Sequence, residues 1–305
     1  MRFLSPGGGG AVACIAPQTL MYVKLSHVFP RVIGDATGGL LADANDVPTT
    51  LFLHGGPGLS AIAERTRLVM PCPVDWWEQP RAHEGQTAPY ACLLREAEQK
   101  FTSMCAASAA PIRLLASSFG CMLARHLAAR FPDAISVIVL LAPTFDPQAS
   151  YRRFAATLLD TSPSPALHAA YESCKSNSAT AAFWDLVAAI LATPRFSDSY
   201  WSVGAMPARR QFAALMADSA GFDFPTYRLV LDDFLTTPPP SGPSPYRGPV
   251  TVTVGASDPY ATLERTRAEV HRYFPQAQLS LVDAGHFPHL ELAPEFWLPH
   301  DFAEQ

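Results

Sequence analysis

Short apolar runs alternate along the chain with longer stretches in which apolar residues recur at helical spacing. Several of the short runs are apolar at every position, which is typical of parallel strands covered by helices on both faces. The runs interpreted as strands are Leu20–Leu25, Thr49–Leu53, Ile112–Ala116, Ile135–Leu141, Val250–Val254 and Leu279–Val282. Helices are expected over Tyr90–Cys105, Cys121–Phe131 and Ala261–Phe274. This alternation predicts an α/β fold with a mostly parallel sheet.

The middle of the chain follows a different pattern. It contains no convincing strand, and its helical stretches, rich in Ala, Leu and aromatic residues, are separated by Pro, Gly and Ser. The proline-rich segment Thr236–Pro245 predicts a stiff linker back to the sheet. We therefore expect a helical insertion at residues 150–245 within an α/β core formed by 19–149 and 246–305, with 1–18 as a flexible extension.

Composition excludes several classes of protein. The 305 residues are 49% hydrophobic and 16% charged, which describes a soluble globular chain. A net charge of −5 without a basic run favours neither nucleic acid nor a membrane as partner, and no apolar run is long enough to span one. The six cysteines include no C-x-x-C pair, so we expect reduced, mostly buried thiols and a cytoplasmic protein. No cofactor or metal is expected, and the oligomeric state stays open.

Two adjacent serines follow the expected strand Ile112–Ala116. A nucleophilic serine between a strand and a helix needs small residues two positions before and after it, because the chain turns sharply there. Ser118 meets this condition with Ala116 and Gly120, whereas Ser117 would require a small residue at Phe119. Ser118 is therefore the candidate nucleophile. Taken alone, the pentapeptide is a weak signal, since a loop serine often caps the next helix.

A glycine-rich loop, H-G-G-P-G at residues 54–58, follows another expected strand. Acyl transfer requires backbone N–H groups directed at the developing oxyanion, and glycines let the chain approach the substrate closely. We expect the N–H groups of Gly56 and Phe119 to form this oxyanion hole and Gly55 to contact substrate. A plain Gly-Pro turn is the alternative.

An acid and an imidazole follow the last two expected strands. Asp258 lies just after Val250–Val254, and His286 follows the final strand. Serine needs a histidine to take its proton and an acid to orient that histidine. The order of these residues along the chain, Ser118, Asp258 and His286, is the order in which such triads occur when a parallel α/β sheet carries them. Asp146 is an alternative acid. His286, His289 and Glu291 could instead suggest a metal site, although their spacing is not that of a helical ligand pair.

These four motifs together resemble the α/β-hydrolase superfamily, and the H-G-G-P-G loop is similar to that of its proline iminopeptidase-like branch. The resemblance implies a helical cap over a triad of Ser118, Asp258 and His286, with Gly56 and Phe119 as oxyanion hole. Two features depart from the branch. Residues 78–85 read E-Q-P-R-A-H-E-G and lack the glycine after arginine, and phenylalanine follows Ser118 where tryptophan is usual.

The identity of the substrate depends on the inserted helices and on aromatic residues. Trp76 and Trp77, placed after a presumed strand, and Trp184 and Trp201 of the insertion are expected to line a largely apolar pocket. We expect a serine hydrolase acting on an ester, thioester, lactone or amide of a small molecule or short peptide. An aminopeptidase is the alternative, and it would need a carboxylate of the insertion to bind the substrate amine. The candidates are Glu172, Asp185, Asp218, Asp223, Asp232 and Asp233. A lyase, an acyltransferase or a ligand-binding protein is the alternative of another class.

Overall fold

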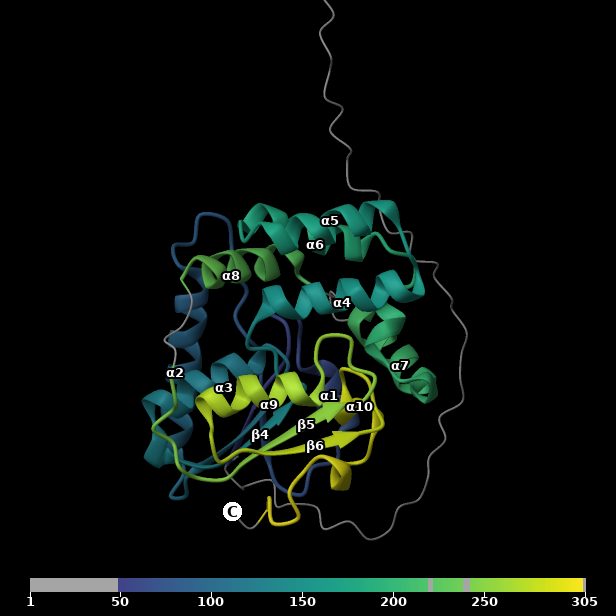
Figure 1. The fold of residues 1–305 in the computed structure, drawn as a ribbon. Helices are drawn as coiled ribbons and strands as arrows, with labels where there is room; N and C mark the ends of the chain where they lie inside the picture. The colour runs from purple at the N-terminus through teal and green to yellow at the C-terminus, as the bar shows by residue number, and fades with distance from the viewer. Residues whose placement is uncertain (1–48, 219–221, 238–241, 304–305) are drawn as a thin grey trace, which may run out of the picture. The chain divides into compact units, whose positions relative to one another are not determined.

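A single parallel sheet organises the computed structural model, which describes residues 49–218, 222–237 and 242–303. Its strand order is β2-β1-β3-β4-β5-β6, and every pairing among the described strands is parallel (Figure 1). The strands are β1 (Thr50–Leu53), β2 (Val74–Trp77), β3 (Ile112–Ser117), β4 (Ile135–Leu141), β5 (Val250–Gly255) and β6 (Gln278–Val282). The predicted α/β class and mostly parallel sheet are confirmed.

One strand of the sheet was not recognised from the sequence. Among the described strands β2 pairs only with β1, and all four of its residues are half-buried. As an edge strand that carries Asp75 it lacks the continuous apolar run of the central strands. Trp76 and Trp77 therefore lie within this strand, and the expectation that they follow a strand was wrong. The expected strand Leu20–Leu25 lies outside the described residues.

Successive residues of each central strand serve two separate hydrophobic cores. Leu51 and Leu114 point to the face covered by α2 (Pro89–Ala107), α3 (Gly120–Arg130) and α9 (Leu263–Tyr273). Phe52 and Leu115 point to the other face, where they meet residues such as Ala61, just before α1 (Ile62–Arg67), and Trp297. This alternation with a period of two residues is the reason that these strands are apolar throughout.

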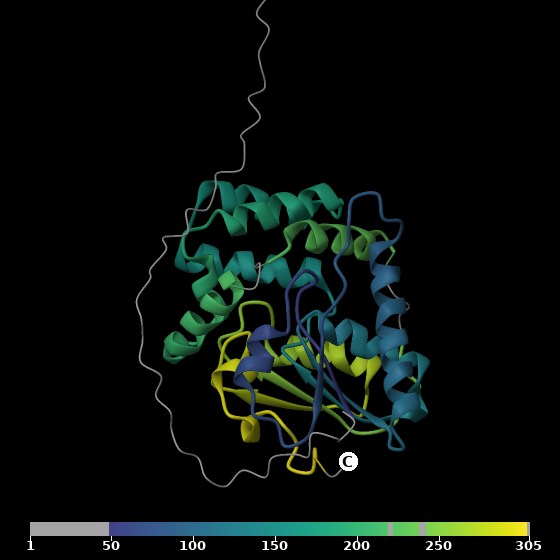
Figure 2. The ribbon, with the colours of Figure 1, turned by 180° about the vertical axis from the view of Figure 1, so that it is seen from behind.

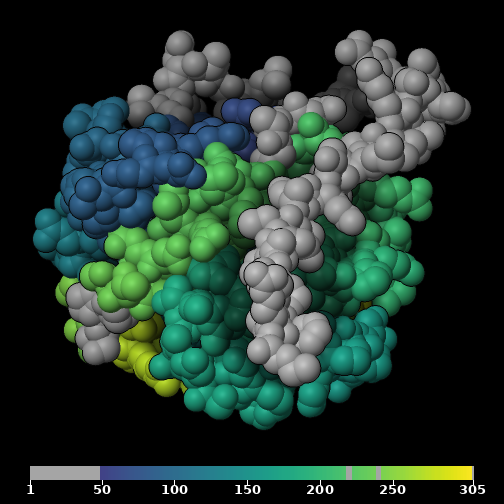
Figure 3. All heavy atoms as spheres, turned by 90° about the horizontal axis from the view of Figure 1, so that it is seen from above, coloured from purple at the N-terminus to yellow at the C-terminus, as the bar shows by residue number. Residues whose placement is uncertain are grey.

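The chain between β4 and β5 is helical. It contains α4 (Pro147–Thr161), α5 (Pro165–Ser176), α6 (Thr180–Leu191), α7 (Met206–Asp218) and α8 (Phe224–Thr236), and no strand is found among its described residues. Figures 1 and 2 show these helices gathered on one side of the sheet, and Figure 3 shows that α8 adjoins the blue residues around the start of α2. Asp146, Ser164 and Asp223 cap α4, α5 and α8 through side-chain oxygens.

Candidate active site

The sharp turn after β3 holds Ser118 in a strained conformation. Its φ of 50° lies in the left-handed region, which residues other than glycine rarely adopt. Its N–H donates to the carbonyl of Leu141 at 2.8 Å. A Cβ on Gly120 would lie 2.0 Å from the carbonyl oxygen of Leu53, so only glycine fits where α3 begins beside β1. The glycine of the motif is thus required by the packing.

Ser118, His286 and Asp258 form a continuous chain of hydrogen-bonding groups. The Ser118 Oγ lies 2.9 Å from the Nε2 of His286, and the Nδ1 of His286 lies 3.0 Å from the Oδ2 of Asp258. Asp258 and His286 are each only 3% exposed, so solvent does not compete for these contacts. With the Nδ1 proton donated to the carboxylate, Nε2 is free to accept the proton of the serine hydroxyl.

The loops that carry Asp258 and His286 are joined through their backbones. The N–H of Ser257 donates to the carbonyl of Ala284 at 2.9 Å. A Cβ on Gly255 would lie 2.0 Å from the carbonyl oxygen of Gly285, so the two loops approach as closely as glycine allows. The Glu291 carboxylate accepts the Gly285 N–H at 2.9 Å. These contacts fix the separation between the acid and the imidazole.

The glycine-rich loop after β1 is held by His54. Its Nε2 accepts the Gln79 N–H at 3.1 Å, so Nδ1 carries the proton and donates to the carbonyl of Gly55 at 2.9 Å. The Gln79 amide nitrogen donates to the His54 carbonyl at 2.7 Å. Burial lowers the pKa of His54, although the contact with the Gly55 carbonyl partly opposes this. The ring therefore stays neutral and supports the loop.

The expected oxyanion donors are present in this loop and at the elbow. Gly56 has a φ of 51°, and a Cβ on Gly55 would lie 3.1 Å from the Ser118 Cβ. In the part of the chain that the structure describes, the N–H groups of Gly56 and Phe119 donate to no protein acceptor. Two unpaired N–H groups near a serine hydroxyl are suited to an oxyanion.

Aromatic rings surround His286. Its ring centroid lies 4.8 Å from that of Tyr260, 5.2 Å from Phe287 and 5.9 Å from Tyr200. The hydroxyls of Tyr200 and Tyr260 are 2.6 Å apart, and those of Tyr151 and Tyr227 also pair. Burial raises the pKa of all four phenols above its usual value. These side chains are therefore neutral over the physiological pH range.

The four tryptophans expected to contact substrate lie in different places. Trp201 packs on Phe287 at 5.0 Å between ring centroids and thus adjoins the His286 loop. The Trp184 Nε1 donates to Asp232 at 2.5 Å, and its ring packs on Tyr227. Trp76 packs on Phe52, and Trp77 packs against the opposite core. Of these four tryptophans, only Trp201 packs on a ring, that of Phe287, which also packs on His286.

The alternative acid and the suggested metal site are placed elsewhere. Asp146 caps α4 by accepting the Ala149 N–H at 2.9 Å, and half of its side chain is exposed. His289 contacts the Glu64 carboxylate at 3.2 Å, while Glu291 binds the backbone of the His286 loop. Among the described residues no group of three or more His, Cys, Asp or Glu side chains could hold a metal ion.

The carboxylates proposed for amine binding have other environments. Asp223 forms an ion pair with Arg81 at 3.3 Å and caps α8 by accepting the Thr226 N–H. Asp232 is bonded to Trp184, and Asp233 accepts the Tyr90 N–H at 2.9 Å. Asp185 is exposed, and Glu172 pairs with Lys175 at the surface. The side chain of Asp218 lies outside the described residues. None of the five that are described contacts His286 or Ser118.

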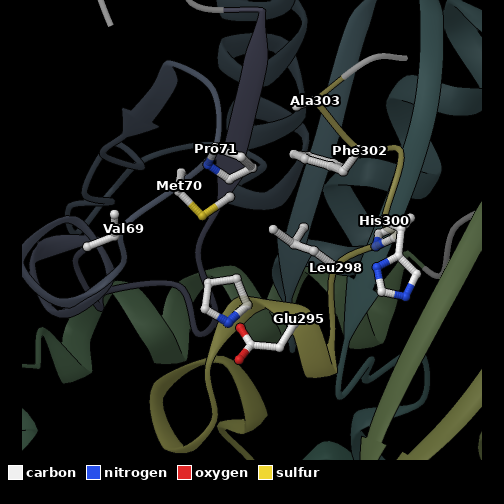
Figure 4. A pocket seen from close by; sticks show the side chains of 10 residues that line it. Val69, Met70, Pro71, Glu295, Leu298, His300, Phe302 and Ala303 are labelled. Atoms are coloured by element: carbon white, nitrogen blue, oxygen red, sulfur yellow. The ribbon is translucent and has the colours of Figure 1, made fainter. Parts of the chain in front are cut away.

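Two pockets lie away from Ser118. One, of about 320 Å³, is lined by Met70, Leu298 and Phe302 near the end of the chain (Figure 4). The other, of about 460 Å³, lies between α2, α3 and α8. Neither is lined by Ser118 or His286.

The cysteines and the helices bear on two further expectations. The five described cysteines are free, as expected, but only Cys121 and Cys174 are buried. The expectation that the thiols are mostly buried was therefore wrong for Cys72, Cys92 and Cys105, which are half-buried; Cys72 and Cys105 lie at the margins of the two cores. Within the described residues, no helix is both long and apolar enough to cross a membrane.

Several residues of the site were not identified from the sequence as parts of it. His54 and Gln79 support the glycine loop, and Tyr260 donates its N–H to the Asp258 Oδ1 at 2.8 Å. Tyr200 accepts the His286 N–H with its carbonyl oxygen at 2.7 Å. His54 lies inside one of the four motifs and Tyr260 directly follows another, which was the available signal, whereas nothing in the sequence marks Tyr200 among the other aromatic residues of the insertion.

Comparisons with known proteins give one family. A sequence model described as alpha/beta hydrolase fold matches residues 104–293. Among solved structures, the chain is similar to a proline iminopeptidase-related protein from Thermus thermophilus, with 22% identity, a TM-score of 0.58, and coverage of 85% of this chain and 89% of that one. An enol-lactonase from Burkholderia xenovorans has 17% identity and a TM-score of 0.52, with 84% and 90% covered. A proline iminopeptidase from Mycobacterium smegmatis has 19% identity and a TM-score of 0.51, with 82% and 86% covered. A search of curated proteins found no match.

Proposed function

Because the chain belongs to the α/β-hydrolase fold family, we propose that it is a serine hydrolase with Ser118 as nucleophile, His286 as base and Asp258 as orienting acid. The observation that carries this proposal is the unbroken contact from Ser118 Oγ through His286 to Asp258, at 2.9 and 3.0 Å. Residues 168 and 28 positions apart in the sequence meet in the order that the chemistry requires.

The reaction follows from this geometry. His286 Nε2 takes the proton of Ser118 as the oxygen attacks the acyl carbon, and the Asp258 carboxylate stabilises the imidazolium. The N–H groups of Gly56 and Phe119 then bind the oxyanion of the tetrahedral intermediate. Protonated His286 gives its proton to the leaving group, which departs and leaves an acyl group on Ser118. Water, deprotonated by His286, attacks this ester and releases the acid and the free serine.

The surroundings of His286 favour a neutral, partly apolar acyl substrate. The adjoining side chains of Tyr200, Tyr260 and Phe287 are uncharged, since burial keeps the phenols protonated. An aminopeptidase needs a carboxylate for the ammonium group of its substrate, and the five described candidates are exposed or bound to other groups. We therefore propose an ester, thioester or lactone, rather than an N-terminal peptide bond, as the substrate. Residues 150–245 would form the cap over this site.

Covalent labelling with a fluorophosphonate tests the nucleophile. The reagent is expected to label the native protein and the Ser117→Ala variant and to leave Ser118→Ala unlabelled. Ser117 is the matched control because it is buried and directly adjacent. Equal labelling of Ser118→Ala would refute the assignment.

A panel of substrates tests the bond that is cleaved. p-Nitrophenyl esters of short acids, a lactone and proline p-nitroanilide would be compared by kcat/KM. We expect the esters or the lactone to be the better substrates. A proline anilide that is turned over faster than every ester would make the protein an aminopeptidase and contradict the proposed substrate class.

A further inference from the structure

A second pocket, separate from the proposed catalytic residues, contains a buried arginine. The pocket of about 460 Å³ is lined by Tyr90 and Leu94 of α2, Arg125 of α3, Asp233 of α8 and Tyr273 of α9. Figure 1 shows α2, α3 and α8 on the same side of the structure. A cavity of this size holds a small organic molecule. Its lining combines a few polar groups with apolar side chains, as ligand sites commonly do.

Arg125 is buried without a counter-ion. The residue is 7% exposed, and within the described part of the chain it donates no hydrogen bond and forms no ion pair. Its Nη1 is buried with no partner. The guanidinium carbon lies 4.3 Å from the centroid of the Tyr273 ring, whose face offsets part of the cost of removing the charge from water. The Nη1 group of this guanidinium is therefore left unsatisfied beside the cavity.

The neighbouring charged groups already have partners. Asp233 accepts the N–H groups of Tyr90 and Ala91, at 2.9 and 3.4 Å, at the start of α2. Glu98 contacts His126 at 2.6 Å and Arg130 at 3.2 Å. Neither carboxylate lies within ion-pair distance of Arg125. A partner for this guanidinium must therefore come from outside the described chain.

We propose that this pocket binds a small organic acid whose carboxylate pairs with Arg125. The planar guanidinium matches a carboxylate with two parallel hydrogen bonds, and Ala91 and Leu94 provide an apolar surface for the rest of the molecule. The site is distinct from that of Ser118, but the two are neighbours: Tyr90 lines the pocket, and its ring packs on Phe119 at 6.2 Å. A bound acid would lie one side chain behind the proposed oxyanion donor.

Calorimetric titration with benzoate and hexanoate, at low salt and millimolar concentration, tests the proposal. We expect at least one acid to bind saturably, its uncharged amide to bind less well, and Arg125→Gln to weaken the acid about tenfold or more. Arg95→Gln is the matched control, since Arg95 is exposed on α2 and does not line the pocket; it is expected to leave binding unchanged.

A second variant covers the case in which Arg125→Gln does not fold. Ala91→Phe keeps the arginine and fills the pocket, so it is expected to reduce binding of the acid to a similar degree. The proposal is overturned if neither acid binds saturably, if the amide binds as tightly as the acid, or if the Ala91→Phe protein binds the acid as the native protein does. These readouts do not depend on turnover, so they stand or fall separately from the role of Ser118.

Discussion

The two parts of the site are held in different ways. Ser118, Asp258 and His286 stand on loops of the sheet that are fixed by backbone contacts and by glycines with no room for a side chain. The segment between β4 and β5 contributes aromatic rings and side-chain polar contacts, such as the ion pair of Asp223 with Arg81 and the hydrogen bond from the Tyr90 N–H to Asp233. Two backbone hydrogen bonds of this segment reach the loops of the proposed site: the Asp223 N–H donates to the Gly58 carbonyl at 2.9 Å, and the Tyr200 carbonyl accepts the His286 N–H.

We propose that this difference separates the residues that carry out the reaction from those that select the substrate. A reacting constellation must be held to within a fraction of an ångström, and short buried backbone contacts provide such precision. Aromatic packing tolerates more variation, since it is less directional than a hydrogen bond. We therefore expect changes in the sheet loops to affect kcat and changes at the helical segment to affect mainly KM.

The largest effect is expected for Asp258→Asn. The amide cannot stabilise the imidazolium as the carboxylate does, so kcat for a p-nitrophenyl ester should fall about 10⁴-fold. Asp146→Asn is the control and should leave kcat near the native value, because Asp146 caps a helix at the surface. A comparable loss in Asp146→Asn alone would show that the acid has been assigned to the wrong residue.

Gly285→Ala tests the junction between the two parts. The added Cβ would lie 2.3 Å from the carbonyl oxygen of Tyr200, so either the His286 loop or the Tyr200 segment must move. We expect a loss of about 1–3 kcal/mol in the free energy of unfolding, together with a lower kcat. Gly204→Ala is the matched control, since its Cβ would meet nothing within 4 Å. Equal melting temperatures for the two variants would contradict this tight junction.

The pH dependence of stability tests the support under the glycine loop. The pKa of His54 is lowered in the folded protein, so below about pH 6.5 the unfolded chain binds a proton that the folded chain does not. The neutral His54 ring therefore contributes to the free energy of unfolding above that pH, and this contribution is lost as the pH falls. Urea unfolding at pH 7 and pH 5 should show a smaller difference for His54→Asn than for the native protein, by at most about 1.4 kcal/mol per pH unit.

His83→Asn is the control for this experiment because His83 is exposed. It should keep the native pH dependence. If His54→Asn also keeps it, the neutral, buried state of the His54 ring does not contribute to acid sensitivity.

The smallest effect is expected for Arg81→Gln, which removes the ion pair with Asp223. The arginine side chain is 53% exposed, and such surface pairs contribute about 1 kcal/mol or less. KM for the ester should rise modestly, with kcat and the melting temperature nearly unchanged. A loss of kcat as large as that expected for Asp258→Asn would contradict the proposal that the helical segment affects mainly KM.

Local patterns sufficed for much of the fold and for choosing three residues, Ser118, Asp258 and His286, whose side chains the structure brings together. The apolar runs predicted β3, β4 and β5 because a strand covered on both faces must be apolar throughout. Ser118, Asp258 and His286 could be selected because each directly follows a strand, and the carboxyl ends of parallel strands meet at one edge of the sheet. The resemblance to the α/β-hydrolase superfamily is confirmed by the family match.

The remaining features depend on contacts between residues far apart in the sequence. β2 could not be recognised because its four half-buried residues do not form a continuous apolar run, and its identity comes from pairing with β1. The rings of Tyr200 and Tyr260 meet across 60 residues at His286, which no local periodicity encodes. Arg125 is part of an ordinary amphipathic helix in the sequence, and only the packing of α2, α8 and α9 around it shows a buried charge whose Nη1 has no partner among the described residues.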